Sequence, residues 1–145
     1  MKLPGYVTEE EVKRVCKELR IRDWTKLKKP EVLPKEAKVI LAHVNTEKMK
    51  IPPEDFRIGL EVELEHGTIF KPYNVTNNHP ILTGKIVMAH FMETLDYYKR
   101  LEIAEVEGDL LKAVIAKNME KIQKYYKKLA KAKIELVKVE SGRLK

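Results

Sequence analysis

The last third of the chain carries one apolar stripe, and this stripe constrains the fold more than any other feature. Its members recur every four or seven residues: Leu111, Ile115, Ile122, Leu129 and Leu136. On a helix such residues share one face, while lysine fills most of the other positions. The spacing predicts one long helix over residues 109–138. No segment alternates like a strand, so we expect an all-α fold.

The composition predicts a soluble chain with one hydrophobic core. The chain has 145 residues, and 43% of them are hydrophobic, which suffices for a core. Charged residues make up 35%, mostly Lys and Glu. This bias is typical of proteins from hot environments, so we predict a thermophilic source. No apolar run approaches the roughly 20 residues that cross a bilayer, and no signal peptide is recognisable. We expect a cytoplasmic protein with no membrane partner.

Positive charge is concentrated in the C-terminal segment. Residues 109–145 hold eleven Lys or Arg against four Asp or Glu, whereas residues 1–108 are neutral within a chain of net charge +7. We therefore divide the chain into a helical core domain, 1–108, and a basic helix with its tail, 109–145. The basic helix packs on the core or serves for association.

Two helices are expected in the first third of the chain. Thr8-Glu-Glu-Glu11 is a capping box, which predicts a helix over residues 8–20. Cys16 lies on its apolar face, and we interpret it as a buried structural thiol. Residues 34–43 open with a proline and predict a second, short helix, with His43 near its end and at the surface.

Two longer segments should form a central antiparallel helix pair. The first, 53–66, opens with a proline and two acids and ends at Gly67, which predicts a left-handed C-cap. The second, 79–107, opens with an Asn-His-Pro sequence and ends before Gly108. Residues 68–78 are rich in turn formers and predict a loop. With the N-terminal helix packed on this pair, we expect a small helical bundle.

Two short clusters each place a carboxylate and an imidazole three residues apart. Glu63 precedes His66, and His90 precedes Glu93. On a helix such residues share one face, and helical bundles present metal ligands at this spacing. Carboxylate and imidazole suit zinc, manganese or iron. A metal site would use Glu63, His66 and either His79 or His90.

Helix register argues against pooling the two clusters. In a simple antiparallel hairpin Glu63 lies level with Leu82 or Thr83. His90 would then lie roughly a dozen ångströms from Glu63, at about 1.5 Å of rise per residue. Only a large axial offset between the helices would unite the ligands.

The same register makes Gly59 and Gly84 nearly face each other, which would let the two backbones approach closely. It also favours a polar cluster that is satisfied without metal. In that alternative, Glu63 accepts from Thr83 or the amides of residues 74–78, or pairs with Lys85; His66 caps its own helix; and His90 bonds Tyr97. We favour this structural cluster, with metal binding by Glu63 and His66 as the alternative.

No catalytic signature stands out. Leu82-Thr-Gly-Lys85 lacks both the upstream glycine and the following Ser or Thr of a phosphate-binding loop. Ser141 is the single serine, which leaves no serine-nucleophile triad. We therefore predict a non-enzymatic structural or interaction protein without catalytic residues or cofactor, the divalent metal of the alternative excepted.

The lysines of the C-terminal segment raise nonspecific nucleic-acid binding as a second alternative. They would track phosphates, with tyrosines beside them for stacking. Arg143 is the only arginine there, although arginine leads in specific base recognition. We favour helix–helix association, and thus a homo-oligomer formed through this helix. The lysines that would bind nucleic acid are Lys121, Lys124, Lys127, Lys128 and Lys131.

Four motifs occur in order along the middle of the chain: Val62-Glu-Leu-Glu-His-Gly67, Asn74-Val-Thr-Asn77, Leu82-Thr-Gly-Lys85 and Asp96-Tyr-Tyr98. Together they resemble a small uncharacterised prokaryotic and viral family of unknown function. The resemblance covers residues 7–24 and 53–102, so 25–52 look like an insertion and the basic helix like an extension. It departs at Asn78-His79, where the family has acids before the proline. It implies a shared fold and an association with viruses or plasmids, and no activity.

Overall fold

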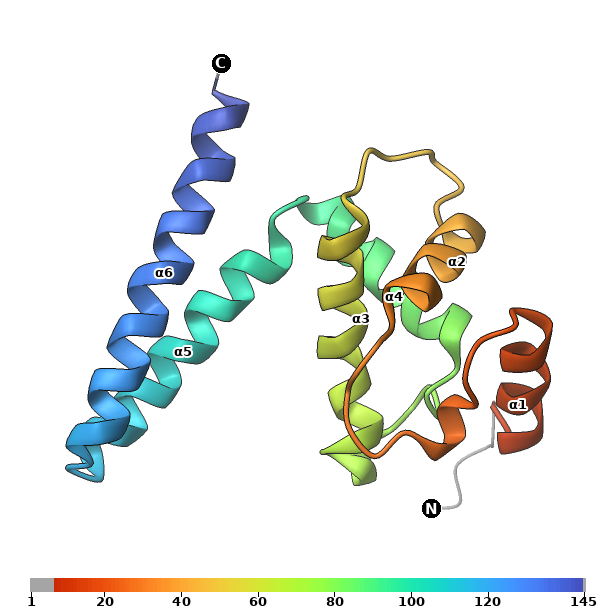
Figure 1. The fold of residues 1–145 in the computed structure, drawn as a ribbon, viewed down its shortest axis with the longest axis horizontal. Helices are drawn as coiled ribbons and strands as arrows, with labels where there is room; N and C mark the ends of the chain where they lie inside the picture. Colours follow the sequence, from red (N-terminus) through yellow and green to blue (C-terminus); the bar gives the residue numbers. More distant parts are fainter. Residues whose placement is uncertain (1–6, 145) are drawn as a thin grey trace. The chain divides into compact units, whose positions relative to one another are not determined.

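The computed structural model describes residues 7–144, and this part of the chain forms six α-helices, two short 3-10 helices and no strand (Figure 1). The all-α prediction is confirmed. None of these helices combines the length and the apolarity that crossing a bilayer would require. The elements are α1 (Glu9–Glu18), η1 (Trp24–Lys26), α2 (Pro34–Val44), α3 (Pro53–Thr68), η2 (Lys71–Tyr73), α4 (Pro80–Glu93), α5 (Tyr97–Ile115) and α6 (Met119–Arg143).

The helices belong to two compact units. The first unit ends at Met92 and contains α1 to α4, and the second begins at Glu93 and contains α5 and α6. We placed a boundary after residue 108 because a glycine there interrupts the charge and apolar patterns. Gly108 instead lies inside α5.

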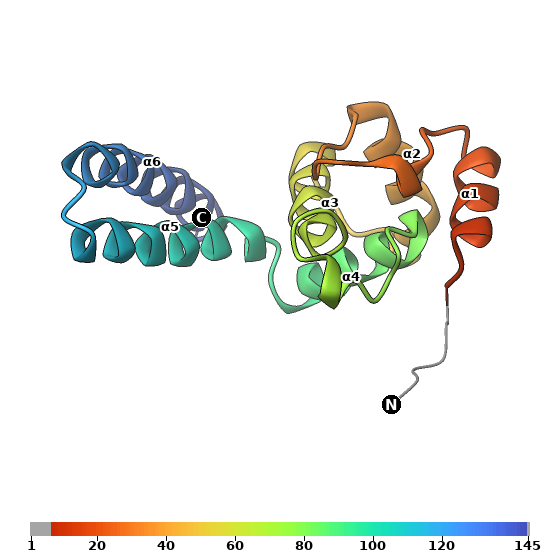
Figure 2. The ribbon, with the colours of Figure 1, turned by 90° about the horizontal axis from the view of Figure 1, so that it is seen from below.

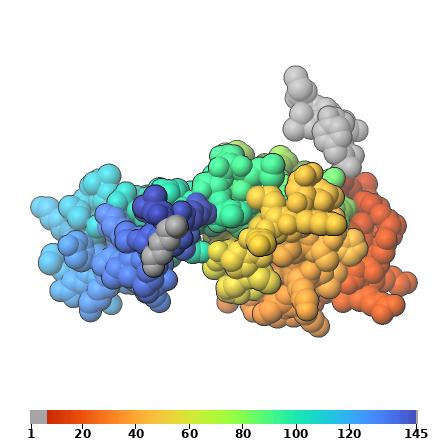
Figure 3. Space-filling model, turned by 90° about the horizontal axis from the view of Figure 1, so that it is seen from above, coloured from red at the N-terminus to blue at the C-terminus, as the bar shows by residue number. Residues whose placement is uncertain are grey.

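Helix α3 is the centre of the first unit. Phe56, Leu60 and Leu64 recur on one face of the helix, and all three are buried. Helix α2 lies directly against α3 (Figure 3). It adds Ala37 and Ile40 to the core. Viewed along α3, α2 lies on one side of it and α4 on the other (Figure 2). The closest backbone neighbour of α3 is therefore α2, and not α4 as the predicted central pair required.

Gly84 on α4 serves this three-helix contact. A Cβ atom there would lie 2.7 Å from Ile40, 3.3 Å from Val44 and 3.5 Å from Phe56. The glycine makes room for side chains of α2 and α3, and not for the backbone at Gly59 as we predicted. Residues 34–44, which we placed in an insertion, are part of the core.

A buried carboxylate fixes the segment between α1 and α2. The fully buried side chain of Glu36 accepts hydrogen bonds from the Arg22 guanidinium at 2.8 and 2.9 Å, and from the amides of Arg22 and Leu33 at 3.0 Å. Burial by itself would raise the pKa of Glu36, but these donors hold that pKa below its ordinary value. The chain between the two helices is thus held to the core.

The N-terminal helix confirms two predictions. The Thr8 hydroxyl accepts a hydrogen bond from the Glu11 amide at 3.2 Å, so Thr8 is the N-cap of α1. Cys16 is buried, and its sulfur accepts a hydrogen bond from the Trp24 amide at 3.5 Å. Burial raises the pKa of the Cys16 thiol, as expected for a structural cysteine.

Gly67 does not end α3. The helix continues to Thr68 and Gly67 has no positive φ, so the predicted left-handed cap is wrong. The glycine is needed for space, because a Cβ atom would lie 1.6 Å from Oδ1 of Asn78 and 3.1 Å from Nδ2 of Asn74. The left-handed residues are Asn77 and Asn78, with φ of 50° and 58°. Asparagine tolerates this region better than most residues.

The two predicted helices of residues 79–107 and 109–138 have wrong boundaries. The first is broken after Glu93, and α5 starts at Tyr97 and passes through Gly108. The real turn of the chain follows Ile115, where Lys117 has a φ of 51° and Asn118 caps α6. Apolar residues continue across both breaks, so their spacing alone favoured longer helices.

Asp96, between α4 and α5, joins the two ends of the second unit. Its fully buried carboxylate accepts from the Thr94 hydroxyl and from Arg100 at 3.1 Å, and it lies 3.2 Å from Arg143 in the last turn of α6. Burial would raise the pKa of Asp96, but these hydrogen bonds and the two arginine charges hold it below its ordinary value. Arg100 also binds Glu140 at 2.7 Å.

Two glycine substitutions test the assigned roles of Gly67 and Gly108. Gly67→Ala should lower the free energy of unfolding by roughly 1–3 kcal/mol, because the new methyl group collides with Asn78. Gly108→Ala should raise it by about 0.5–1 kcal/mol, because the site is a helix interior with open space around it. Chemical denaturation measures both values. Equal effects of the two substitutions would contradict the assignment.

Asp96→Asn should lower the free energy of unfolding by about 3 kcal/mol at neutral pH, because it leaves two arginines without their buried counter-charge. The fold stabilises the ionised carboxylate of Asp96, which lowers its pKa. This stabilisation is therefore fully present at pH values above the ordinary pKa of 3.8, and it is lost as the pH falls below that value. Asp109→Asn is the control, since Asp109 forms an exposed pair with Lys112. Denaturant titrations at several pH values compare them, and a comparable loss in the control would refute the role of Asp96.

Candidate functional site

Three predicted ligand residues meet between α3 and α4. Oε1 of Glu63 lies 3.6 Å from Nε2 of His90, and Oε2 lies 3.9 Å from Nδ1 of His66. The Glu63 side chain is only 10% exposed, whereas that of His66 is 55% exposed. The prediction that His90 lies a dozen ångströms from Glu63 is therefore wrong.

The direction of the side chains accounts for the difference. Helices α3 and α4 run in opposite directions (Figure 1), and the side chains of a helix lean toward its N-terminus. Glu63 leans toward the start of α3, beside which α4 ends. His90, near the end of α4, leans back along its own helix toward Glu63. A register counted along the backbone omits both displacements.

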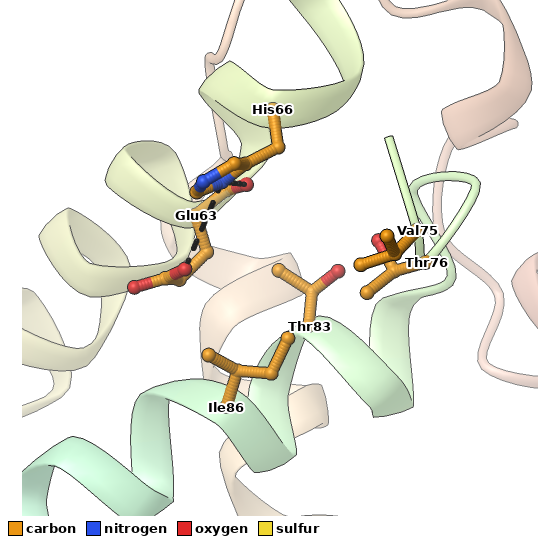
Figure 4. Close-up of a pocket in the computed structure, with 6 residues that line it drawn as sticks. All are labelled: Glu63, His66, Val75, Thr76, Thr83 and Ile86. Atoms are coloured by element: carbon orange, nitrogen blue, oxygen red, sulfur yellow. Dashed lines mark hydrogen bonds and ion pairs between the residues drawn. The ribbon is translucent and has the colours of Figure 1, made fainter. Parts of the chain in front are cut away.

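A small cavity adjoins the carboxylate. Its volume is about 160 Å³, and it is lined by Glu63, His66, Val75, Thr76, Thr83 and Ile86. Figure 4 shows the Thr83 hydroxyl oxygen turned toward Thr76, across the space between α4 and the preceding loop. The Thr83 side chain is buried, and its hydroxyl has no hydrogen-bond partner among residues 7–144. The structural alternative predicted that this hydroxyl donates to Glu63, and that hydrogen bond is not formed.

His66 contacts the backbone of its own helix, but not at the helix end that the structural alternative predicted it would cap. Its Nδ1 lies 3.0 Å from the backbone carbonyl of Glu63, one turn earlier in α3. In the described part of the chain, no group of three or more His, Cys, Asp or Glu side chains is placed so that it could hold a metal ion. The His66 ring is exposed, and its Nδ1 points at the backbone of its own helix.

His79 is placed apart from this cluster. Its Nδ1 accepts hydrogen bonds from the amides of Ile81 and Leu82 at 3.2 and 3.3 Å, so its side chain is the N-cap of α4. The charged neighbours that act on it are Glu11 and Arg14 of α1. With one ring nitrogen committed to the helix, His79 is a capping residue in this fold, and the cluster at Glu63 uses His90 instead.

Comparison with known proteins identifies the family. Residues 12–107 match the family described as "Protein of unknown function (DUF5661)", which is more than half of the chain. The chain belongs to the DUF5661 family. No curated protein and no solved structure matched it. The thermophilic source and the association with viruses or plasmids stay predictions.

Three of the four motifs that carried the resemblance meet at the cavity. The Val62–Gly67 motif supplies Glu63 and His66, the Asn74–Asn77 motif supplies Val75 and Thr76, and the Leu82–Lys85 motif supplies Thr83. Sequence reasoning found Glu63 and His66 by ligand type and named Thr83 as a neighbour of Glu63, but it missed the Thr76 side chain as a lining residue. The signal that pointed to Thr76 was its place in these motifs, since hydroxyl groups have no diagnostic spacing.

The α5–α6 hairpin, whose second helix lies beyond the DUF5661 match, has two unlike faces beside its buried seam. Val106 and Ala113 of α5 and Leu129 and Ala132 of α6 are the buried apolar seam positions. On one side of the seam lie five apolar residues, each more than half exposed, which we call the apolar face: Leu111, Val114, Met119, Tyr126 and Val137.

The other side of the seam carries the predicted nucleic-acid lysines, which we call the lysine face. Lys121, Lys124, Lys128 and Lys131 follow one another at three or four residues, with Lys127 beside them, and all are exposed. Lys128 lies 3.5 Å from Glu102 of α5, and the ammonium of Lys124 lies 5.9 Å from the centre of the Tyr125 ring. Nucleic-acid binding by these lysines stays a prediction.

The histidine N-cap of α4 makes stability depend on pH. Burial lowers the pKa of His79 below its ordinary value of 6.5, and the Glu11 carboxylate only partly opposes this. The unfolded chain therefore takes up the proton first, and the free energy of unfolding should fall as pH drops below about 6.5. His79→Asn keeps a capping oxygen and should remove this part of the slope. Denaturation between pH 5 and 8 measures it.

The matched control is His43→Asn, because His43 is exposed and its Nδ1 lies 2.8 Å from the Val39 carbonyl within its own helix, away from any helix N-terminus. This variant should keep the wild-type slope. If both variants lose the same slope, or neither does, the capping role of His79 is not the cause.

Proposed function

We propose that the protein is a non-enzymatic interaction protein that self-associates through the apolar face of its α5–α6 hairpin. The observation that carries the proposal is the exposure of that face, 51–65% for each of its five residues. Exposed apolar residues gathered on one side of a helical hairpin are typical of interaction sites on soluble proteins. The hairpin buries few large apolar side chains of its own. Covering this face would add the buried apolar surface that a unit of two helices lacks.

A second copy of the chain is the partner that best fits this face. A two-fold dimer brings the same patch of both copies together, so one apolar face per chain suffices. The charges beside the face are balanced, because Lys133 lies 3.4 Å from Glu107 across the two helices. Lys133 is seven residues after Tyr126, and Glu107 four before Leu111, so this neutral pair is on the apolar side.

The lysine face supports the same arrangement. It lies across the seam from the apolar face, so in a dimer of this kind the lysines of both copies stay in solvent and do not oppose each other. Two hairpins packed through their apolar faces form a four-helix bundle, the usual solution for helices with an apolar stripe beyond one seam. Nucleic-acid binding has less support, because Lys128 already has Glu102 as a counter-charge.

Sedimentation equilibrium and light scattering test the proposal. The wild-type chain should have the mass of a dimer, dissociating only on dilution. Tyr126→Glu, and separately Val114→Glu, should shift the equilibrium to the monomer, because a charge at the centre of the dimer interface has no partner there. Both positions are solvent-exposed in the single chain, so folding should be retained, which circular dichroism checks.

Lys124→Glu on the lysine face is the control for the introduced charge. It adds the same carboxylate to the same hairpin and should leave the dimer intact. A wild-type chain that stays monomeric at every concentration would refute self-association and indicate that the apolar face is covered within one chain. Equal dissociation by the control would assign the effect to net charge.

A further inference from the structure

We propose that the cavity bounded by α3, α4 and the loop between them binds a small organic cation, with a primary amine at one end and a hydroxyl group at the other. Glu63 is the acidic wall of this cavity, and Thr83 is its buried hydroxyl wall. Both residues belong to the first unit, so the site is independent of the self-association proposed for the second.

Glu63 supplies the negative charge that selects a cation. Its side chain is 10% exposed, and no other lining residue in the described part of the chain carries a carboxylate. Burial reduces screening by water, so this charge acts strongly on a ligand inside the cavity. A carboxylate accepts about four hydrogen bonds, which is more than the neighbouring imidazoles at 3.6 and 3.9 Å supply. An ammonium group brings three N–H donors and a compensating charge.

Thr83 supplies the second polar group. It is 1% exposed and lines the cavity, and its hydroxyl has no hydrogen-bond partner among residues 7–144. Buried polar groups normally have a partner, so this hydroxyl requires one inside the cavity. Figure 4 shows the Thr83 hydroxyl on the side of Thr76 and the Thr83 methyl group on the side of Glu63. One ammonium group therefore does not serve both polar walls, and the ligand needs a hydroxyl of its own.

The rest of the cavity sets the size of the ligand. Val75 and Ile86 contribute aliphatic surface, which suits methylene groups between the two polar ends. The volume is about 160 Å³, and a cavity of about this size holds a ligand of about six non-hydrogen atoms. Val75 is 80% exposed and the His66 side chain is 55% exposed, so a ligand can enter past these two residues.

NMR titrations of the full chain with three compounds of equal length test the proposal. Propanolamine has an amine and a hydroxyl at opposite ends of its chain, n-butylamine lacks the hydroxyl, and n-butanol lacks the amine. We expect propanolamine to shift the amide signals of residues 75–83 in a saturable way, with a Kd of roughly 1 mM, as for other very small ligands. Binding should be about threefold weaker for n-butylamine and about tenfold weaker for n-butanol, because hydrogen bonds to charged groups are the stronger ones.

Two isosteric variants test the two polar walls separately. Glu63→Gln should weaken propanolamine binding about tenfold and remove its advantage over n-butanol. Thr83→Val should weaken it about threefold and remove its advantage over n-butylamine. Without ligand, Thr83→Val should resist denaturant at least as well as the wild type, because it removes a buried hydroxyl that has no partner in the described residues. It therefore tests the site even if Glu63→Gln folds poorly.

Thr68→Val is the matched control. Thr68 is also a buried threonine in a helix, but its hydroxyl donates to the Leu64 carbonyl at 2.8 Å and it does not line the cavity. This variant should bind propanolamine like the wild type. Four results would overturn the proposal: no saturable shift in the wild type, equal affinity for the three compounds, unchanged binding by both Glu63→Gln and Thr83→Val, or an equal loss in Thr68→Val.

Discussion

The close contact between Gly67 and Asn78 joins the end of α3 to the turn that precedes α4. The last turn of α3 approaches the asparagine so closely that no side chain fits at residue 67. Asn77 and Asn78 take the left-handed conformation that turns the chain there, and His79 then caps α4. The start of α4 is thereby fixed against the end of α3.

Each unit is also secured by one buried acid that is surrounded by donors. Glu36 holds the chain between α1 and α2, and Asp96 holds the first turn of α5 to the last turn of α6. Their pKa values are held low by arginines despite burial. A buried carboxylate without such partners would be strongly destabilising, so the arginines are as much a part of the fold as the acids. The segment before α2 and the two ends of the α5–α6 hairpin are each held in place by one such carboxylate.

The two proposed activities occupy different units and different chemistry. The first unit offers a buried carboxylate and a hydroxyl without a partner in the described residues, both in the wall of a small cavity. The second offers an apolar face with balanced charge beside it and a lysine face across the seam. The DUF5661 match ends within α5, so the cavity belongs to the part shared with the family, and α6 lies beyond it.

Periodicity and capping by themselves determined the helical class, the N-cap at Thr8, the buried thiol of Cys16 and the start of α3 at Pro53, because these depend on interactions within a few residues. The sequence also named Glu63, His66 and His90 by residue type. Only the tertiary structure decided that they meet, since the lean of side chains on opposed helices is invisible in a backbone register. It likewise decided that Gly67 and Gly108 do not end helices. Glycine is compatible both with a turn and with the interior of a helix. Which of the two forms depends on the residues packed around it, and these are distant in sequence.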